Sequence, residues 1–530
     1  MLHFLQQFDE LYKNLRTKWK HWFLFLFILS LGIFARTWEY RSLPPGIFTD
    51  EASIGVDSYS VYKYGMDRNG VTYPTEFIAF GPEQNALYGY MLIPLLAIFG
   101  LKPIIVRLPM LIYGILTLPL VYFVVKDNFD ENLGLLSMFF LSISPWHILL
   151  SRWGLDQNFF PFMFLLAYAC LLATSRNNKW FILACVLFAL CFYIYGPSYF
   201  IVPVFLTCSI WILIKNKLIY RQYLIIGLSI FCLLAIPILV FLTINAFKFN
   251  AIHIGPVTIP RMPGQPHFLS ASGGFQTNLF QTLLNNLWIL LTLLFKQTDG
   301  LIYNAFEPYG YFYKITFPFA LFGIILLFKK QTLKPSVKNS TFLCWVISCL
   351  VFGVLQPVNI NRINIIFIPL LICIATAFIW LGDKIKPILP IAICSFFIAF
   401  IAFTIDYHGE VYKEMADNKF HLGLLSAIQY ASAISHGPIC VTDKVDMPYI
   451  YVLFVEKPNP NSYLNSMVYI DSPSPFRQVR SLLRYTFGKQ NCINGTQTVY
   501  VLASDEIPPH LGNRYNYQFF ENFVVYFPKS

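Results

Sequence analysis

The stretch HWFLFLFILSLGIFART, residues 21–37, is almost wholly apolar and long enough to cross a bilayer as a helix. Similar stretches recur along the 530-residue chain, which is 56% hydrophobic and has a mean hydropathy of +0.57. Only 12% of its residues are charged, whereas soluble domains carry about 25%. Because lipid offers no partners for open backbone groups, helices are the expected form. We predict an all-α polytopic membrane protein rather than a soluble enzyme.

Hydropathy predicts about eleven transmembrane helices. Their expected ranges are 21–37, 108–125, 133–147, 158–174, 180–196, 199–214, 222–244, 313–328, 341–356, 363–381 and 388–405. The first range is not a cleavable signal peptide, because it lacks a small-residue cleavage site and leads straight into more membrane sequence.

Basic residues orient these helices, because cytoplasmic loops are enriched in Lys and Arg. One end of the predicted bundle receives most of them, which makes it the inside and places the N-terminus there: Lys13, Arg16, Lys18, Lys20, Lys126, Arg176, Lys179, Lys215, Lys217, Arg221, Lys329, Lys330, Lys334, Lys338, Lys384 and Lys386. A crossing at 86–101 would reverse every later loop, so we expect that short segment to be a juxtamembrane helix. A second juxtamembrane helix is expected at about 278–296.

The chain divides into a transmembrane domain, 1–405, with a long first outer loop at 38–107, and an extracytoplasmic tail, 406–530. The tail carries 10 Lys/Arg and 11 Asp/Glu, whereas residues 1–405 carry 28 and 16. Residues 421–434 have helical periodicity, and strands are predicted within 437–444, 449–457, 498–506 and 522–530. We therefore predict a small C-terminal α/β domain.

Most of the 11 cysteines lie in apolar segments and are simplest to explain as small core residues. Cys440 and Cys492 are in the tail, where an extracytoplasmic location permits a disulfide, although spacing alone does not decide whether one forms. Residues 494–496, NGT, fit the short N-glycosylation pattern.

The first outer loop begins with LPPGIFTDEASIGVDSYSVYKYG, residues 43–65, which places Asp50 and Glu51 side by side at a membrane edge. Asp50 fits the N-cap of a juxtamembrane helix with an acidic first turn. That structural role does not exclude chemistry, because a carboxylate there can remove a proton from an acceptor hydroxyl or amine.

The second outer loop contains SRWGLDQNF, residues 151–159. Arg152 and Asp156 are four residues apart, the spacing of an ion pair on a helix. An alternative reading is a guanidinium that binds a phosphate, with an acidic group near a sugar. The sequence leaves both readings open.

Four further residues on the predicted outer face are candidates for substrate binding. Arg107 and Arg362 open predicted helices on the side that is poor in basic residues, so they either anchor the interface by snorkelling or hold an anionic lipid head group. His267 and Tyr309 belong to segments that can cover a site, although isolated His and Tyr residues are more often structural.

Taken together, these motifs resemble the C-type glycosyltransferases, in particular the superfamily of protein O-mannosyltransferases and lipid A aminoarabinose transferases. The resemblance runs from residues 43–65 through GPEQNALYGYMLIPLLAIFGL (81–101), VRLPMLIYGILTLPL (106–120), SPWHILLSRWGLDQNFFPF (144–162) and YIYGPSYF (193–200), and continues weakly through QPVNINRINIIFIP (356–369). It implies a GT-C-like fold. It also implies transfer of a single sugar, with inversion, from a dolichyl- or undecaprenyl-phosphate donor to a lipid, glycan or protein acceptor.

The resemblance also implies residue roles. Asp50 matches the catalytic base, with Glu51 beside it, and Arg152 and Asp156 match the second-loop motif. Arg107 and Arg362 fall where the family contacts the lipid phosphate. One departure is that some members have a basic residue just before the juxtamembrane helix, where this chain has Gln84 and Asn85. Phosphate binding is then expected to depend on arginines elsewhere.

These inferences predict an enzyme of the bacterial inner membrane whose active site and tail domain are periplasmic. No cofactor is required and no metal ligand is assigned, although the carboxylates leave a divalent metal possible. We expect no nucleic-acid partner. The alternatives are a transporter or flippase, which is expected to show repeated halves and polar mid-membrane groups, and a non-catalytic scaffold for envelope assembly.

Overall fold

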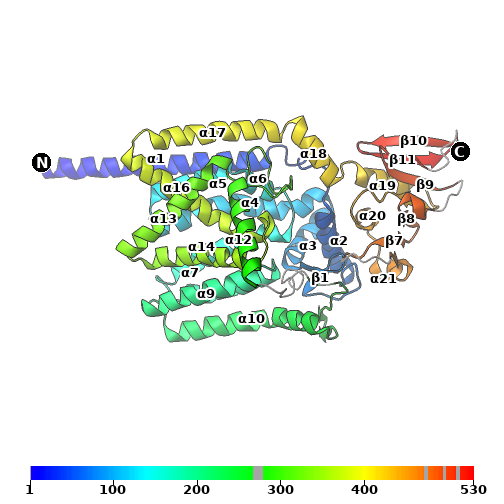
Figure 1. Ribbon diagram of the computed structural model, residues 1–530, viewed down its shortest axis with the longest axis horizontal. Helices are drawn as coiled ribbons and strands as arrows, with labels where there is room; N and C mark the ends of the chain where they lie inside the picture. The colour runs from blue at the N-terminus through cyan, green and yellow to red at the C-terminus, as the bar shows by residue number, and fades with distance from the viewer. Residues whose placement is uncertain are drawn as a thin grey trace.

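The computed structural model describes residues 2–264, 266, 279–470, 476–492, 497–508 and 514–529, with side chains from Trp19 onward. Long helices run along the long axis of the molecule, and a sheet domain lies at one end (Figure 1). The first outer loop, with α2 and α3, lies between the bundle and the sheet domain (Figure 1). The site discussed below is built at this junction.

In the described part of the chain, ten helices are long and apolar enough to span a membrane. Many of their large apolar side chains face outward, including Leu233 (65% exposed) and Ile398 (66% exposed), as expected for surfaces that contact lipid. The prediction of an all-α polytopic membrane protein is therefore confirmed. The helices are α1 (Leu2–Thr37), α4 (Pro103–Asn128), α7 (Asp156–Ala173), α9 (Ser198–Lys215), α10 (Arg221–Phe247), α12 (Leu279–Lys296), α13 (Phe317–Leu333), α14 (Val337–Leu355), α16 (Phe367–Lys384) and α17 (Ile388–Tyr407).

Two of the eleven predicted spans are shorter than expected. The range 133–147 is divided into α5 (Glu131–Ile143) and α6 (Pro145–Leu150), because Ser144 caps a new helix that begins at Pro145. The range 180–196 is α8 (Lys179–Leu190), followed by a 3₁₀ turn, η1 (Cys191–Tyr193). Both α5 and α8 are apolar, but they have only 13 and 12 residues.

The two segments expected to be juxtamembrane helices are α3 (Leu87–Phe99) and α12. The first has 13 residues, too few to cross a bilayer on its own. The second has 18 residues and meets the length and hydropathy criteria for a span. However, it is drawn across the long helices rather than along them (Figure 1), and Phe280, Trp288 and Phe295 on it are highly exposed. This arrangement is that of a helix lying at a membrane surface.

Ion pairs join three of the basic loops at one end of the bundle. Asp127, at the end of α4, pairs with Arg176, which follows α7, and with Lys338 at the start of α14 (3.5 Å). Lys126 pairs with Glu131 at the start of α5 (2.5 Å). These contacts place the loops after α4, α7 and α13 on one face, as the distribution of basic residues predicts.

The first outer loop forms a compact unit of its own. Its helix α2 (Thr49–Tyr64) follows Pro44, Pro45 and Gly46, and it ends at Gly65, whose φ of 70° favours glycine. Strands β1 (Glu76–Ile78) and β2 (Glu83–Asn85) then pair as an antiparallel hairpin before α3 begins. Because Asp50 and Glu51 occupy the first turn of α2, they lie at the positive end of the helix dipole.

The tail contains the predicted α/β domain. Its seven-stranded sheet has the order β10-β11-β9-β5-β8-β7-β6, with central β5 parallel to both neighbours. The strands are β5 (Ile439–Val441), β6 (Val468–Tyr469), β7 (Val479–Leu482), β8 (Tyr485–Phe487), β9 (Val499–Ala503), β10 (Tyr515–Phe520) and β11 (Phe523–Pro528). The helices are α18 (Glu410–Phe420), α19 (Leu424–Ile434), α20 (Tyr449–Glu456) and α21 (Pro460–Tyr463).

The strands predicted within 437–444, 498–506 and 522–530 and the helix predicted at 421–434 are confirmed. The strand predicted at 449–457 is wrong, because this segment is α20. Its run of apolar residues is buried on all sides, so its hydrophobicity does not alternate, and α20 packs against α2 of the first loop.

Cys440 and Cys492 form a disulfide with a Cα–Cα distance of 5.8 Å. The glycosylation pattern at 494–496 lies outside the described residues.

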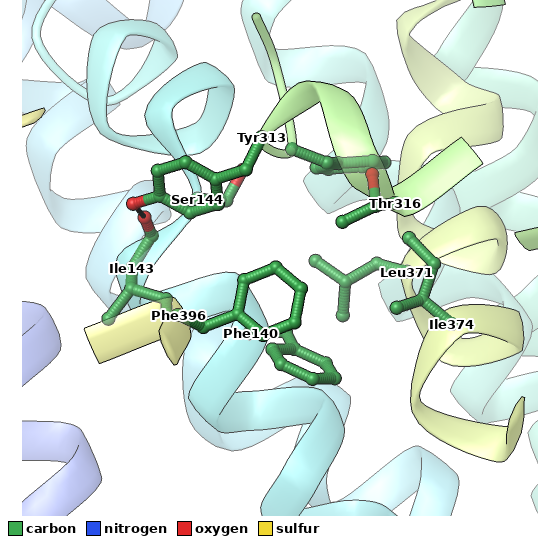
Figure 2. Close-up of a pocket in the computed structure, with 9 residues that line it drawn as sticks. Phe140, Ile143, Ser144, Tyr313, Thr316, Leu371, Ile374 and Phe396 are labelled. Atoms are coloured by element: carbon green, nitrogen blue, oxygen red, sulfur yellow. Dashed lines mark hydrogen bonds between the residues drawn. The ribbon is translucent and has the colours of Figure 1, made fainter. Parts of the chain in front are cut away.

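A small cavity lies within the bundle, away from the first loop. It is lined by apolar side chains of α5, α16 and α17, including Phe140, Leu371 and Phe396 (Figure 2). Tyr313 closes one side, where its hydroxyl donates to the Ile143 carbonyl (2.7 Å). The volume of about 10 Å³ leaves room for about one water molecule at most, so the cavity is too small for a sugar or lipid chain.

We expect Gly323→Val to disrupt the packing of α13 on α16. A Cβ atom at Gly323 would lie 1.9 Å from the Cys373 carbonyl oxygen, so the two helices would have to separate. The variant should unfold at a clearly lower temperature than the wild type in detergent, as measured by tryptophan fluorescence. Gly437→Ala is the control, because its added Cβ would meet only atoms at ordinary van der Waals distance, the nearest 3.8 Å away. Equal melting temperatures for both variants would contradict this explanation of the packing.

Candidate active site

Glu51 is fully buried and makes four hydrogen bonds. Its carboxylate accepts two bonds from Arg107 (Nε and Nη2, both 2.8 Å), one from the Gly154 backbone (2.8 Å) and one from the Phe48 backbone (3.1 Å). Arg107 in turn donates to the carbonyls of Pro44 and Gly46. The Glu51–Arg107 ion pair therefore joins the start of α2 to α4 and to the second outer loop, and the Glu51 carboxylate is already committed to protein partners.

Asp50 has the opposite environment, although it is the adjacent residue. It is partly exposed, and no hydrogen bond or ion pair to its carboxylate is found within the described chain. Burial among protein groups raises the pKa of Asp50 to about 6, the charge of Arg68 acts in the opposite direction, and Glu51 and Asp446 add to the rise. A carboxylate that lacks a partner and titrates near neutral pH is a suitable general base.

The second outer loop places Asp156 next to the first loop. Asp156 begins α7, and its carboxylate accepts a hydrogen bond from the Asn85 backbone (3.2 Å). The charge of Asp50 also acts on Asp156, so the two carboxylates lie within electrostatic range of each other. The Asn85 side chain donates to the Tyr199 hydroxyl (3.2 Å) and to the Phe192 carbonyl (3.3 Å). Asn85 therefore connects the hairpin, α7 and α9.

Arg68 forms the wall of the site on the other side of α2. It is buried and pairs with Asp57 (2.8 Å), and it donates to Ser53 (2.7 Å) and to the carbonyl of Ala79. Ser53 in turn donates to Gln84 (3.0 Å). Gln84 is therefore hydrogen bonded to α2, the helix that carries Asp50.

Arg152 is buried at the C-terminal end of α1, where it donates to the carbonyls of Arg36 (3.3 Å) and Trp38. Helix α6 ends at Leu150 and α7 begins at Asp156, so Arg152 and Asp156 do not share a helix, and the predicted ion pair between them does not form. In this structure the guanidinium groups of Arg107 and Arg152 are both directed at protein acceptors.

Arg362 differs from these two arginines. It lies in the short helix α15 (Ile360–Ile363), is partly exposed, and its guanidinium donates to the Pro357 carbonyl (3.0 Å). The described residues provide no acidic partner for it within salt-bridge distance. Asn364, two residues after Arg362, donates to the carbonyl of Gln157, the neighbour of Asp156 (2.9 Å), so the segment that carries Arg362 is joined to the start of α7. Of the two arginines predicted to contact the phosphate, Arg107 and Arg362, only Arg362 has no acidic partner in the described part of the chain.

The last two sequence candidates are not placed in the site. The Tyr309 hydroxyl donates to Asp406 at the end of α17 (2.5 Å), and its ring packs on Phe403. No contact connects Tyr309 to Asp50 within the described chain. His267 lies outside the described residues.

Sequence reasoning missed several residues around Asp50. The Tyr303 ring packs against Phe48 and Trp153, and its hydroxyl is close enough to Asp50 for the two charges to interact. Tyr451, from α20 of the tail, hydrogen bonds Thr49 (2.8 Å). Asp446 acts on Asp50 from the tail as well. The two tail residues are nearly 400 positions from Asp50, so no local pattern could have identified them.

Hydrogen bonds join the first outer loop to the second outer loop and to two later segments of the chain. Glu51 and Gly154 connect the first and second loops. Thr258, from the hairpin β3 (Ile252–Ile254) and β4 (Val257–Ile259), accepts from the Thr75 backbone (3.0 Å). Asn364 at the start of η3 (Asn364–Ile366) donates to the Gln157 carbonyl (2.9 Å). These bonds hold the four segments together.

Known proteins resemble this chain in its fold. The family model described as dolichyl-phosphate-mannose-protein mannosyltransferase matches residues 85–241, which run from the hairpin through α10. No curated protein matches the chain. Among solved structures, ArnT from Cupriavidus metallidurans matches with a TM-score of 0.56 at 12% identity, covering 96% of this chain and 98% of ArnT. The same protein bound to undecaprenyl phosphate matches with a TM-score of 0.55.

The archaeal oligosaccharyltransferase from Archaeoglobus fulgidus is also similar, with a TM-score of 0.51 at 12% identity. The match covers 82% of this chain but only 61% of the archaeal protein. A second structure of that protein, AglB with an inhibitory peptide and a dolichol-phosphate, gives the same TM-score. The resemblance to the C-type glycosyltransferases is therefore confirmed, and the chain has the GT-C fold with a small C-terminal sheet domain.

We expect Glu51→Gln to destabilise the protein, whereas Asp50→Asn should not. Glu51→Gln leaves Arg107 buried without its counter-charge, which costs about 3–5 kcal/mol. The fold raises the pKa of Asp50 above its usual value, so ionised Asp50 opposes folding at pH 7 and its neutral amide does not. Thermal unfolding in detergent at pH 7 measures both effects. A lower melting temperature for Asp50→Asn than for Glu51→Gln would contradict these roles.

Proposed function

We propose that this protein is a membrane glycosyltransferase that moves a single sugar from a polyprenyl-phosphate donor to a hydroxyl or amine acceptor, with inversion and with Asp50 as the base. The observation that carries this proposal is the contrast between Asp50 and Glu51. One carboxylate is free and titrates near neutral pH, while its neighbour is locked in an ion pair. The GT-C fold and the match to the mannosyltransferase family model support the reaction class.

Asp50 can act as a base because no hydrogen bond or ion pair in the described part of the chain occupies its carboxylate. Its charge acts on Asp156, so a polar acceptor group between the two carboxylates would be held on both sides. Asp50 would take the acceptor proton as the acceptor oxygen or nitrogen attacks the anomeric carbon. The phosphate leaves from the opposite face of the sugar, which inverts the anomeric configuration.

The donor phosphate would meet Arg362. This arginine has a partly exposed guanidinium on the segment joined to the start of α7, and its charge would offset the charge that develops on the leaving phosphate. Some family members have a basic residue where this chain has Gln84 and Asn85. Both of these side chains hydrogen bond to protein groups, which agrees with a phosphate contact made by Arg362. The polyprenyl tail would lie in lipid beside the bundle.

We place the protein in a bacterial inner membrane, with its N-terminus in the cytoplasm and the Asp50 site and tail domain in the periplasm. Support comes from the ion-paired basic loops at the end of the bundle away from the sheet domain. A scaffold or a transporter would not need an unpaired carboxylate beside a buried ion pair, so the enzyme is the reading that we favour.

Asp50→Asn should reduce sugar transfer at least about 100-fold, because the amide cannot accept the acceptor proton. The assay supplies the purified protein in liposomes with dolichyl- and undecaprenyl-phosphate monosaccharides, mannose first, and membrane extract as the acceptor source. Release of polyprenyl phosphate is followed by mass spectrometry. Asp443→Asn, which alters an exposed tail carboxylate, is the control; wild-type turnover by Asp50→Asn would refute the assignment.

Transfer should fall on the acidic side of about pH 6. The base must be ionised, and the pKa of Asp50 is raised to about 6, so below that pH kcat/KM should drop about tenfold per pH unit. A profile measured between pH 4.5 and 8 tests this. An acidic limb near pH 4, the ordinary range of an aspartate, would show that another group limits the rate.

We also propose that transfer requires no divalent metal. A phosphate leaving group needs little assistance beyond a cation, and Arg362 supplies one. Activity should be unchanged after dialysis against EDTA. Loss of activity in EDTA, with recovery on adding Mg²⁺ or Mn²⁺, would contradict this proposal.

A further inference from the structure

The tail domain is fastened directly to the first outer loop. The Tyr451 hydroxyl bonds Thr49 (2.8 Å), the Ile47 backbone donates to the Phe420 carbonyl (2.7 Å), and the Tyr463 hydroxyl donates to the Arg68 carbonyl (2.8 Å). Thr49 is the residue before Asp50. These bonds hold the tail against the first loop, and the loop between β5 and α20 leads directly into the helix whose Tyr451 bonds the residue before Asp50.

Asp446 is the acidic residue that this loop presents to the site. Its charge acts on four groups that come from three parts of the chain: Asp50, Tyr303, His421 and Tyr451. Asp446 is exposed, and the described residues give its carboxylate no hydrogen bond or ion pair. Its charge is therefore not offset by a partner in the described part of the chain.

The backbone beside Asp446 is unusual. Met447 has a φ of 52°, a conformation that side chains other than glycine rarely adopt. Such strained residues persist where the surrounding structure holds them, and they cluster at functional sites. Here Pro448 follows and begins the turn into α20, while Tyr449 and Tyr451 on α20 are buried against the first loop.

The balance of charge around Asp50 is negative. Glu51 is neutralised by Arg107, and Asp57 is neutralised by Arg68. Asp50 is then left within electrostatic range of Asp156 and of Asp446, and in the proposed reaction the donor phosphate binds Arg362. An acceptor head group that carried its own phosphate or carboxylate would meet uncompensated like charge.

We propose that Asp446 is a specificity-determining residue of the transfer site and that it selects an acceptor whose head group is an uncharged polyol or carries an amine. This inference rests on the proposed transferase function and names the class of its acceptor. The tail domain, through Asp446, repels acidic head groups and offers a hydrogen-bond acceptor to hydroxyl or ammonium groups. No bond to Asp446 forms or breaks during transfer.

The test uses a matched pair of acceptor probes, octyl β-glucoside and octyl β-glucuronide, which differ by one carboxylate. The full-length protein in liposomes receives the same polyprenyl-phosphate donors as above. We expect the wild type to favour the glucoside by at least about tenfold in kcat/KM, Asp446→Asn to narrow this ratio at least fivefold, and Asp446→Lys to favour the glucuronide. Asp443→Asn is the control, because Asp443 lies in the same loop but bonds Gln490 (2.7 Å).

A pH profile provides a second readout that a purely structural residue would not change. The charges that act on Asp50 come from Arg68, Glu51 and Asp446. Asp156, Tyr303 and Tyr451 are also near. Of all these groups, only Asp446 comes from an exposed loop of the tail. Removing its charge should move the acidic limb to lower pH by about half a unit. This arm uses membrane extract as acceptor, so it applies even if neither octyl probe is glycosylated.

The outcomes separate the two proposals. A wild type that turns over no donor contradicts the proposed function itself. If the wild type transfers sugar but Asp446→Asn leaves the glucoside-to-glucuronide ratio unchanged, the role of Asp446 is overturned and the transferase proposal stands. Where neither octyl probe reacts, an acidic limb that does not move in Asp446→Asn has the same meaning. Equal effects of Asp446→Asn and Asp443→Asn would also overturn it, because the loop's general charge and not the site carboxylate would then be responsible.

Discussion

The buried ion pair between Glu51 and Arg107 is the interaction on which the site depends. The Glu51 carboxylate also accepts bonds from the backbones of Phe48 and Gly154, and Arg107 binds two carbonyls of the segment before α2. A buried carboxylate and guanidinium are stable together only when their hydrogen bonds are satisfied, and removal of either one is costly. The pair therefore fixes the first loop, α4 and the second loop in a single geometry.

This constraint explains how two adjacent acidic residues come to have different roles. Successive residues on a helix point in different directions, so the Asp50 carboxylate does not share the Arg107 pair into which Glu51 is directed. Asp50 has no partner within the described chain, and burial raises its pKa to about 6. The bundle supplies a rigid frame, and the tail closes the site through Thr49 and Tyr451.

Hydropathy was sufficient to predict the membrane fold, because each long span carries its own signal. It was less accurate where a break depends on one residue, as at Ser144 and Pro145, and it misread α20, whose apolar run is buried by tertiary contacts rather than by a sheet. The position of Asp50 followed from the motif at 43–65. The partners of the arginines did not, because a guanidinium reaches carbonyls far away in the chain, as Arg152 reaches Trp38.

The most direct test of the central claim, that Asp50 performs sugar transfer from a polyprenyl-phosphate donor, is mass spectrometry of cellular lipids. Cells carrying the wild type or Asp50→Asn at matched expression are compared for their polyprenyl-phosphate sugars. We expect one such lipid to accumulate in the Asp50→Asn cells, because its sugar is no longer consumed, and the mass of that lipid identifies the donor. Identical lipid profiles together with unchanged envelope glycans would contradict the account and leave Asp50 as a residue of the first helical turn.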